Sequence, residues 1–161
     1  MGARSGTLAI RARPAARCGK RREGRMSNAE IARQYFANAS RNVDAALALF
    51  APGAEFLFPL GALPMPDGVR AYLGGYAQSF PDSGFDLTNV FEQGDQVAVE
   101  GFWFGTHTGP MQLPDGTSVP ATQRKVRAPF ATLFTIRAGK ITSHRGYWDM
   151  AGFMMQLGLS R

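Results

Sequence analysis

Asp149 is the residue of this sequence best suited to proton chemistry, because it directly follows the aromatic pair Tyr147-Trp148. Residues 141–148 show a strand pattern, so the acid stands where that strand ends. Aromatic neighbours partly desolvate a carboxylate, and desolvation raises its pKa toward the range that suits proton transfer. An acid at this place is equally suited to capping a helix that follows it. The residues alone leave both interpretations open.

Histidine is the second kind of proton carrier here, and the chain has two. His107 lies in the segment G-T-H-T-G and is a candidate acid or base near neutral pH. A strand-end histidine bonded to the backbone is the alternative. His144 is expected to point outward or toward an interface, with contact to a ligand as the alternative. Its neighbour Arg145 could stabilise an enolate or a carboxylate, or form a surface ion pair.

Strand alternation predicts which of these side chains share a face. In residues 141–149 it places Arg145, Tyr147 and Asp149 together, and in residues 96–108 it places Trp103 with His107. A bulge would invert part of this sorting. Tyrosine hydroxyls could donate a hydrogen bond to a substrate oxygen. Side chains that could contact a ligand in this or another way, or could equally be ordinary core, are Tyr35, Phe58, Tyr76, Trp103, Arg145 and Tyr147.

The helices and strands that must position these residues are predicted from the spacing of apolar residues, which changes along the chain from a helical period to a strand period. A capping box at Ser27 begins a helix of about three turns, Asn42 caps a second helix that runs to Phe50, and Asp67 caps a third that runs to about Phe80. Residues 55–58 are predicted to form a short strand. Four longer strands follow at residues 85–92, 96–108, 125–137 and 141–148, and residues 150–159 form a short helix or turn. This order predicts an α+β domain with a bent antiparallel sheet around helices.

Length and charge place the chain in a broad class. Its 161 residues suit one domain, and 45% of them are apolar. The net charge of +6 is uneven, because residues 1–25 carry +7 and residues 26–161 carry −1. We expect residues 1–25 to be a disordered basic extension, or sequence upstream of a true start at Met26. Organellar targeting and nucleic-acid or lipid binding are the alternatives for that segment.

Several functional classes are disfavoured for the domain of residues 26–161. No apolar run approaches the roughly 20 residues of a membrane span, and the only cysteine is Cys18. Phosphate-binding glycine loops, a nucleophile elbow and a zinc-binding H-E-x-x-H are missing from the sequence. We therefore expect a cytoplasmic protein without metal or cofactor, and a domain that contacts neither nucleic acid nor membrane.

Four stretches together resemble a known family. They are residues 48–56, residues 105–110 with 120–122, residues 134–141, and residues 145–149 with 156–159. Their types and order resemble the SnoaL-like polyketide cyclase or ester cyclase family of the nuclear-transport-factor-2-like superfamily. The resemblance implies a cone of three N-terminal helices packed in a strongly bent antiparallel sheet. It also implies a homodimer formed through the outer sheet face.

The resemblance implies a chemistry as well. Members close a ring by an intramolecular aldol condensation without a cofactor, with an aspartate on the last strand as acid and base. Asp149 matches that position. His107 matches the family's threonine-histidine segment and is expected to face the mouth of the pocket. We expect a cyclase or isomerase that acts through the enolate of a small, apolar polyketide- or ester-like carbonyl compound, with Tyr147 or His107 stabilising the oxyanion. A non-catalytic ligand-binding or dimerisation module is the main alternative. Limonene-type epoxide hydrolysis is disfavoured, because no R-x-D pair occurs.

Overall fold

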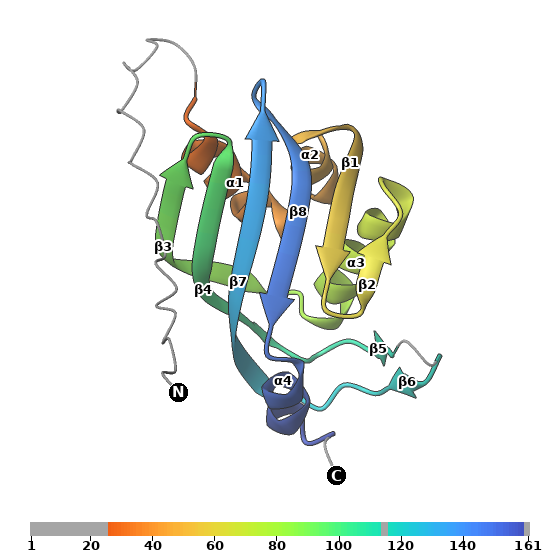
Figure 1. Ribbon diagram of the computed structural model, residues 1–161. Coiled ribbons are helices and arrows are strands. Elements are labelled where there is room, and N and C mark those ends of the chain that lie inside the picture. Colours follow the sequence, from red (N-terminus) through yellow and green to blue (C-terminus); the bar gives the residue numbers. More distant parts are fainter. Residues whose placement is uncertain (1–25, 114–115, 160–161) are drawn as a thin grey trace, which may run out of the picture.

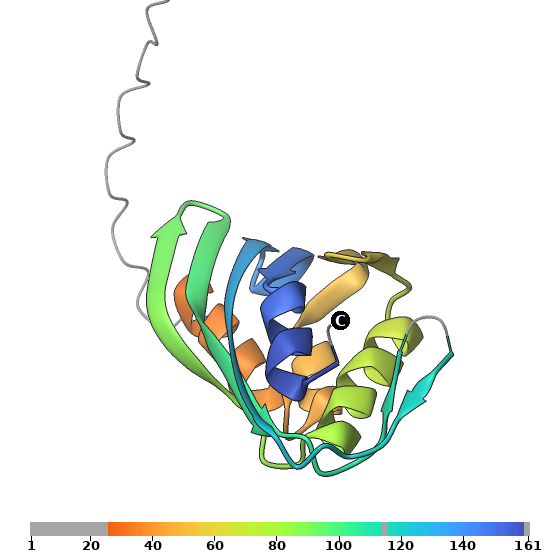
Figure 2. The ribbon, with the colours of Figure 1, turned by 90° about the horizontal axis from the view of Figure 1, so that it is seen from below.

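The computed structural model describes residues 26–113 and 116–159. The basic segment predicted for residues 1–25 lies outside this part of the chain. Three helices are packed against one face of a six-stranded, curved sheet, and a fourth helix lies at one end of that sheet (Figure 1). Seen along the strands, the sheet forms an arc that encloses the helices (Figure 2). The expected cone-like α+β architecture is present.

The N-terminal helices begin where side chains satisfy free backbone N–H groups. In α1 (Asn28–Ala39) the Ser27 hydroxyl accepts a hydrogen bond from the Glu30 N–H at 3.2 Å. In α2 (Val43–Leu47) Asn42 accepts from the Ala45 N–H at 3.0 Å. Both predicted caps are confirmed. However, α2 ends three residues earlier than predicted, because Phe50 already pairs with Ile141 in the sheet.

The third helix, α3 (Asp67–Ser79), follows the first two strands. It has no side-chain cap: Pro66 stands at the cap position, and Asp67 instead forms an ion pair with Arg70 at 3.0 Å. The prediction that Asp67 caps this helix is therefore wrong. The last helix, α4 (Met150–Leu157), ends at Gly158, whose positive φ of 75° is the left-handed conformation that favours glycine.

The main sheet has the strand order β2-β1-β8-β7-β4-β3. Its strands are β1 (Phe50–Phe58), β2 (Gly61–Leu63), β3 (Gly84–Gln93), β4 (Gln96–Thr106), β7 (Lys125–Arg137) and β8 (Lys140–Trp148). β1 runs parallel to β8, so the sheet is mixed and the predicted purely antiparallel sheet is wrong. Alternating apolar and polar residues indicate which face of a strand is buried, but they do not indicate whether neighbouring strands run parallel or antiparallel. A small hairpin of β5 (Met111–Gln112) and β6 (Ser118–Val119) occupies the long connection after β4.

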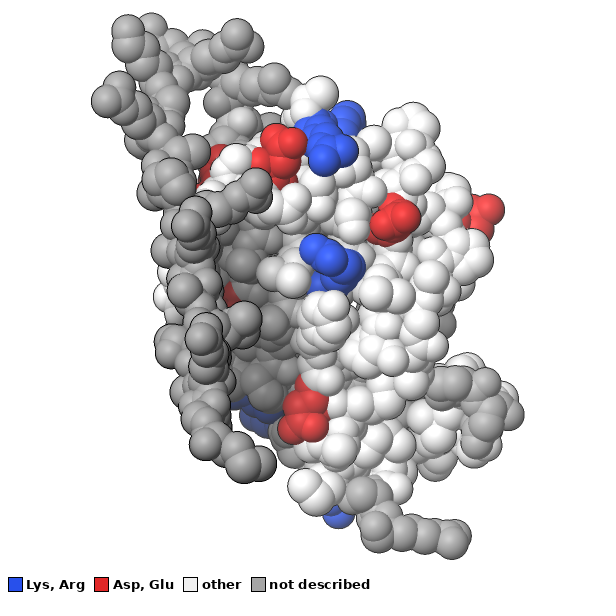
Figure 3. Space-filling model, viewed as in Figure 1, with Lys and Arg blue, Asp and Glu red and all other residues white. Residues whose placement is uncertain are grey.

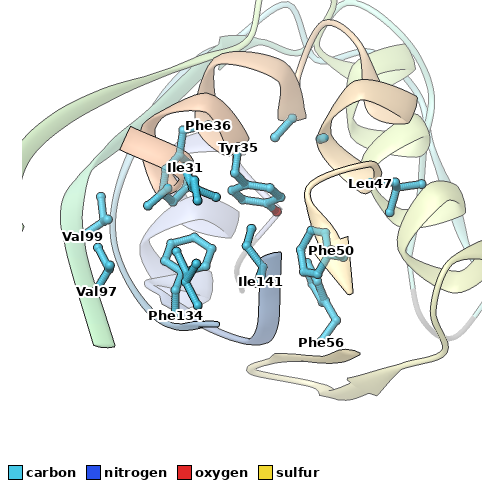
Figure 4. Close-up of a cluster of buried hydrophobic side chains, with 14 of the residues drawn as sticks. Ile31, Tyr35, Phe36, Leu47, Phe50, Phe56, Val97, Val99, Phe134 and Ile141 are labelled. Atoms are coloured by element: carbon cyan, nitrogen blue, oxygen red, sulfur yellow. The ribbon is translucent and has the colours of Figure 1, made fainter. Parts of the chain in front are cut away.

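The main core fills the hollow between the sheet and α1. Tyr35 of α1 lies between Phe50 of β1 and Phe134 of β7, and Phe36 of α1 also meets Phe134 (Figure 4). A second buried cluster packs α4 against β7 and the end of α3; its members are Phe80, Met111, Val126, Ala128, Phe153 and Leu157. Among the described residues, none of the helices has the length and apolarity to cross a membrane.

Candidate functional site

An aromatic cavity of about 110 Å³ lies inside the cone, between the helices and the concave face of the sheet. It is lined by α1, α3 and five strands of the main sheet. Its lining residues are Tyr35, Phe36, Ala39, Ser40, Phe56, Phe58, Tyr72, Leu73, Tyr76, Ala77, Ser83, Phe85, Trp103, Ala128, Phe130, Thr132, His144, Gly146 and Trp148. Within the described part of the chain, this lining contains no Asp, Glu, Lys or Arg. The cavity therefore suits an uncharged, largely apolar ligand.

His144 of β8 is the titratable ring at the base of this cavity. Its imidazole stacks on Phe56 with ring centroids 4.0 Å apart and planes 5° apart, and Tyr35 and Phe134 meet it edge-on. Gly146 makes room for it, since a Cβ there would lie 3.0 Å from the imidazole Cε1. Burial lowers the pKa of His144 from 6.5 to about 3, so the ring is neutral at physiological pH.

The nitrogen atoms of His144 differ in surroundings. Nδ1 is buried and has no hydrogen-bond partner among the described residues. Interactions with the backbone of His144 itself and of Leu57 raise its pKa, but by less than burial lowers it. A buried nitrogen without a partner costs folding free energy. A ligand that bonds to this ring would relieve that cost.

Tyr72 and Tyr76 supply hydroxyl groups from the opposite wall of the cavity. They stand one turn apart on α3, so both side chains lie on the same face, and their ring centroids are 5.0 Å apart. Burial raises the pKa of Tyr76 to about 12 and raises the pKa of Tyr72 further. Interaction with the Tyr76 hydroxyl also raises the pKa of Tyr72, which is the effect expected if Tyr72 is the donor of the pair.

Trp148 contributes one more donor at the same wall. Its ring lies edge-on to Tyr76, and its influence on Tyr72 lowers the pKa of that phenol slightly. The indole Nε1–H is buried, and no described residue accepts from it in good hydrogen-bond geometry. The cavity thus combines aromatic walls with phenol and indole donors and one neutral imidazole, a set that suits recognition of a carbonyl or hydroxyl oxygen.

Arg145, Tyr147 and Asp149 do not line this cavity, although the strand pattern predicted that they would share its face. The pairing of β7 with β8 shifts between Thr135 and Ile136, which leaves Thr142 as an extra residue in β8. Beyond this bulge every side chain changes face. The inward residues are therefore those lining the cavity from β8: His144, Gly146 and Trp148. The expectation that His144 points outward is wrong for the same reason.

Asp149 acts as the N-cap of α4. Its Oδ1 accepts a hydrogen bond from the Gly152 N–H at 2.9 Å, and the residue is exposed. Gly152 is required beside it, because a Cβ at that position would overlap the carboxylate. Tyr147 has 49% of its surface exposed on the outer side of the sheet. Of the two roles that the sequence left open for Asp149, the structure places the residue in the cap.

His107 lies on the inner side of the fold, as strand alternation predicts, but outside the lining of the cavity. Its ring stacks on Phe80, and its Nδ1 accepts from the Thr122 N–H at 3.2 Å. Its backbone also bonds to Gln123 and Arg124 at 2.9 Å. Burial lowers its pKa. The expectation that His107 faces the pocket mouth is wrong, since the ring anchors residues 122–124 instead.

Tyr35, Phe58 and Trp103 are the sequence-predicted contact residues that the structure brings together in the cavity lining. His144, Tyr72 and Trp148 were not among the predicted site residues. Tyr76, which the sequence offers as a hydrogen-bond donor to a substrate oxygen, also lines the cavity. The i, i+4 spacing of Tyr72 and Tyr76 was a signal for a hydroxyl pair. No sequence signal located the bulge that turns His144 inward.

The fold is shared with many solved structures. A candidate SnoaL-like polyketide cyclase from Jannaschia sp. CCS1 is similar at 23% identity, covering 89% of this chain and 100% of that chain, with a TM-score of 0.73. AclR, a candidate hydroxylase from Streptomyces galilaeus, is similar at 16% identity, covering 82% and 85%, with a TM-score of 0.71.

A third structure extends this comparison. A protein with a ketosteroid isomerase-like fold from Catenulispora acidiphila DSM 44928, in complex with trimethylamine, is 22% identical, covers 81% of this chain and 94% of that chain, and has a TM-score of 0.67. At these identities the likeness establishes the fold alone. Comparison with curated proteins gives no match.

The sequence itself also matches a family model. The model described as a SnoaL-like domain covers residues 31–144, which is more than half of the chain and includes most of α1 and His144. The chain therefore belongs to the SnoaL-like domain family, within the nuclear-transport-factor-2-like fold that it shares with these structures.

Proposed function

We propose that the chain acts as a cyclase or isomerase on a small, uncharged, largely apolar carbonyl compound held in the aromatic cavity. The observation that carries this proposal is the convergence of His144 with the Tyr72–Tyr76 pair in a cavity whose described lining is otherwise apolar or weakly polar. These groups can hold a carbonyl oxygen and accept a proton without any charged side chain.

The proposed step is the formation of an enolate. A ring nitrogen of His144 takes the proton from the carbon next to the carbonyl, and the electron pair of that C–H bond passes to the carbonyl oxygen. The hydroxyl of Tyr76, which is the acceptor of the tyrosine pair and keeps its own proton, donates a hydrogen bond to that oxygen, where the negative charge develops. If the enolate is conjugated with a C=C bond, return of the proton from His144 at the far carbon gives isomerisation. If the enolate carbon attacks a second carbonyl, a ring closes and the new alkoxide takes the proton from His144.

His144 replaces Asp149 as the proton acceptor in this proposal. Asp149 is exposed and bonded to the N-terminus of α4, whereas His144 is buried against the cavity. A buried imidazole with a pKa of about 3 is a weak base, comparable to a carboxylate, and it enters the reaction in its neutral form. Carboxylates of that strength serve as bases when the enolate is well stabilised.

A test needs a ketone with an aromatic ring, no charge and exchangeable α-protons, and acetophenone meets these conditions. Binding is measured by titration calorimetry, and enolate formation by loss of the methyl proton signal in D₂O. We expect the wild-type chain to bind acetophenone and to accelerate the exchange. His144→Phe keeps the stacked ring but removes the nitrogens, and should lower the exchange rate roughly 100-fold or more.

Two further variants sharpen the test. Tyr76→Phe should lower exchange by a similar factor of roughly 100, because it removes the proposed oxyanion donor. Asp149→Asn preserves the helix cap and should leave exchange unchanged. Undiminished exchange in a folded His144→Phe protein, or its loss in Asp149→Asn, would overturn the assignment of the base.

A second candidate function is ligand binding without catalysis. The observation that favours it is the lack of a carboxylate in the described lining, together with the capping role of Asp149. The same experiment separates the two functions. Binding of acetophenone without any acceleration of exchange would support the binding module.

A further inference from the structure

A second hollow lies next to the cavity, between α3, α4, the β1–β2 turn and the β5 segment. We call it the outer groove; its volume is about 300 Å³. Residues that line it but not the cavity include Ala71, Gly75, Met111, Leu113, Met150 and Met154. As far as the described residues go, none of its lining side chains is charged. Methionine side chains adapt easily to apolar ligands of different shapes.

Four aromatic residues line both hollows: Phe58, Tyr72, Tyr76 and Trp148. Phe58 and Tyr72 are in ring contact at 4.9 Å, Tyr72 and Tyr76 at 5.0 Å, and Tyr76 and Trp148 at 6.3 Å. The same rings therefore form a common wall between the outer groove and the cavity. One of them, Tyr76, also carries the hydroxyl that donates to the carbonyl oxygen in the proposed function.

We propose that the outer groove is the subsite for an apolar chain of the substrate, whose carbonyl-bearing ring occupies the cavity. This inference rests on the proposed function, because the carbonyl end of the substrate must lie near His144 and Tyr76 if its apolar chain is to extend past the shared aromatic wall. The substrate class is then an elongated, uncharged carbonyl compound with a ring at one end and an alkyl or similar apolar chain at the other.

The probes for this subsite are acetophenone, butyrophenone and hexanophenone, which share one head and differ in chain length. Each methylene that leaves water for an apolar surface improves affinity up to roughly fourfold. We expect the dissociation constant of the wild-type chain to fall on the order of two- to fourfold per added methylene. An alkyl chain that remained in water would give no such gain in affinity.

Adjacent glycines of α3 provide a matched pair of variants. Gly75 lines the outer groove and Gly74 lines neither hollow, and a Cβ at either position has no described atom within 4 Å beyond its own helix. Leucine should therefore be accepted at both positions, and it favours a helix more than glycine does. Gly75→Leu should bind acetophenone as the wild type does but lose the gain with chain length. Gly74→Leu should keep that gain.

A second matched pair tests the opposite wall, on α4. Met154 lines the outer groove, whereas its neighbour Met155 does not and is 63% exposed. Met154→Gln should reduce the gain with chain length, and Met155→Gln should leave it unchanged. Thermal unfolding of all four variants shows whether each is folded.

The outcomes separate this inference from the proposed function. If acetophenone binds but longer chains add no affinity, or if Gly75→Leu and Met154→Gln keep the full gain, the subsite is overturned and the proposed function stands. If acetophenone does not bind the wild-type chain, both are overturned. A gain with chain length that is lost only in the groove variants supports the subsite.

Discussion

His144 shows how strongly one residue depends on its surroundings. The side chain is 5% exposed and is enclosed by three aromatic rings, and burial lowers its pKa to about 3. The imidazole must therefore lose its proton when the chain folds at mildly acidic pH. That proton release links folding to pH.

The stability of the protein should consequently fall in acid. Between pH 6.5 and about 3 the unfolded chain binds a proton at this position that the folded chain does not. The contribution of neutral His144 is complete above pH 6.5 and is lost progressively as the pH falls toward 3. The loss is about 1.4 kcal/mol for each pH unit in that window.

Urea unfolding at pH 7, 6, 5 and 4 measures this effect. Over that range the free energy of unfolding should fall less in His144→Phe than in the wild type. The difference should correspond to the uptake of one proton on unfolding. His107 remains in both proteins, so the lowering of its pKa by burial adds the same pH dependence to each. Equal pH dependence in the two proteins would contradict the burial argument for His144.

At the scale of elements, the start of α4 determines how the last strand is used. The chain leaves β8 after Trp148 and enters the helix at once, with Asp149 bonded to the Gly152 N–H. This arrangement fixes α4 against β7 and beside Phe80, and so builds one wall of the outer groove. The cap therefore acts on the site through the position of the helix.

Substitution of the cap should change stability and leave the chemistry unchanged. Asp149→Ala removes the hydrogen bond to a free N–H and should lower the free energy of unfolding by about 1 kcal/mol. Asp149→Asn offers an equivalent oxygen and should stay within a few tenths of that of the wild type. Chemical denaturation checks both values. A cost for Asn equal to that for Ala would show that the charge, and not the hydrogen bond, is what stabilises α4.

At the scale of the whole molecule, the outer face of the sheet carries few charges over β7, β8 and β1 (Figure 3). Leu57 and Leu133 flank Arg145 on the neighbouring strands and are 37% and 38% exposed. Tyr147 lies two residues further along β8. We propose that this surface forms the homodimer interface that the family resemblance implies.

A charge placed in this surface should separate the two copies. Leu133→Lys places a second cation directly opposite Arg145, so burying it in a dimer would desolvate an ammonium group beside a like charge. We expect analytical ultracentrifugation to find the wild type as a dimer and Leu133→Lys as a monomer. Met155→Lys on α4, away from this face, is the control and should remain dimeric. A monomeric wild type would reject the interface.

The local sequence pattern was enough to predict where most helices and strands lie. It was also enough to predict which side chains share the inner face of β4. Examples that follow from the chain itself are the caps at Ser27 and Asn42 and the bounds of β7. They depend on interactions between residues a few positions apart, which a sequence displays directly. The four stretches whose residue types and order resemble the family extended the prediction to the fold and the family.

The composition of the site was decided by tertiary structure. The extra residue Thr142 in β8 turns His144 inward and Asp149 away from the cavity. This bulge arises from the pairing of β8 with β7, and the residue pattern of β7 does not indicate it. The parallel pairing of β1 with β8 likewise joins residues about 90 positions apart. Strand alternation predicts two faces, but only the register of neighbouring strands decides which of them encloses the cavity.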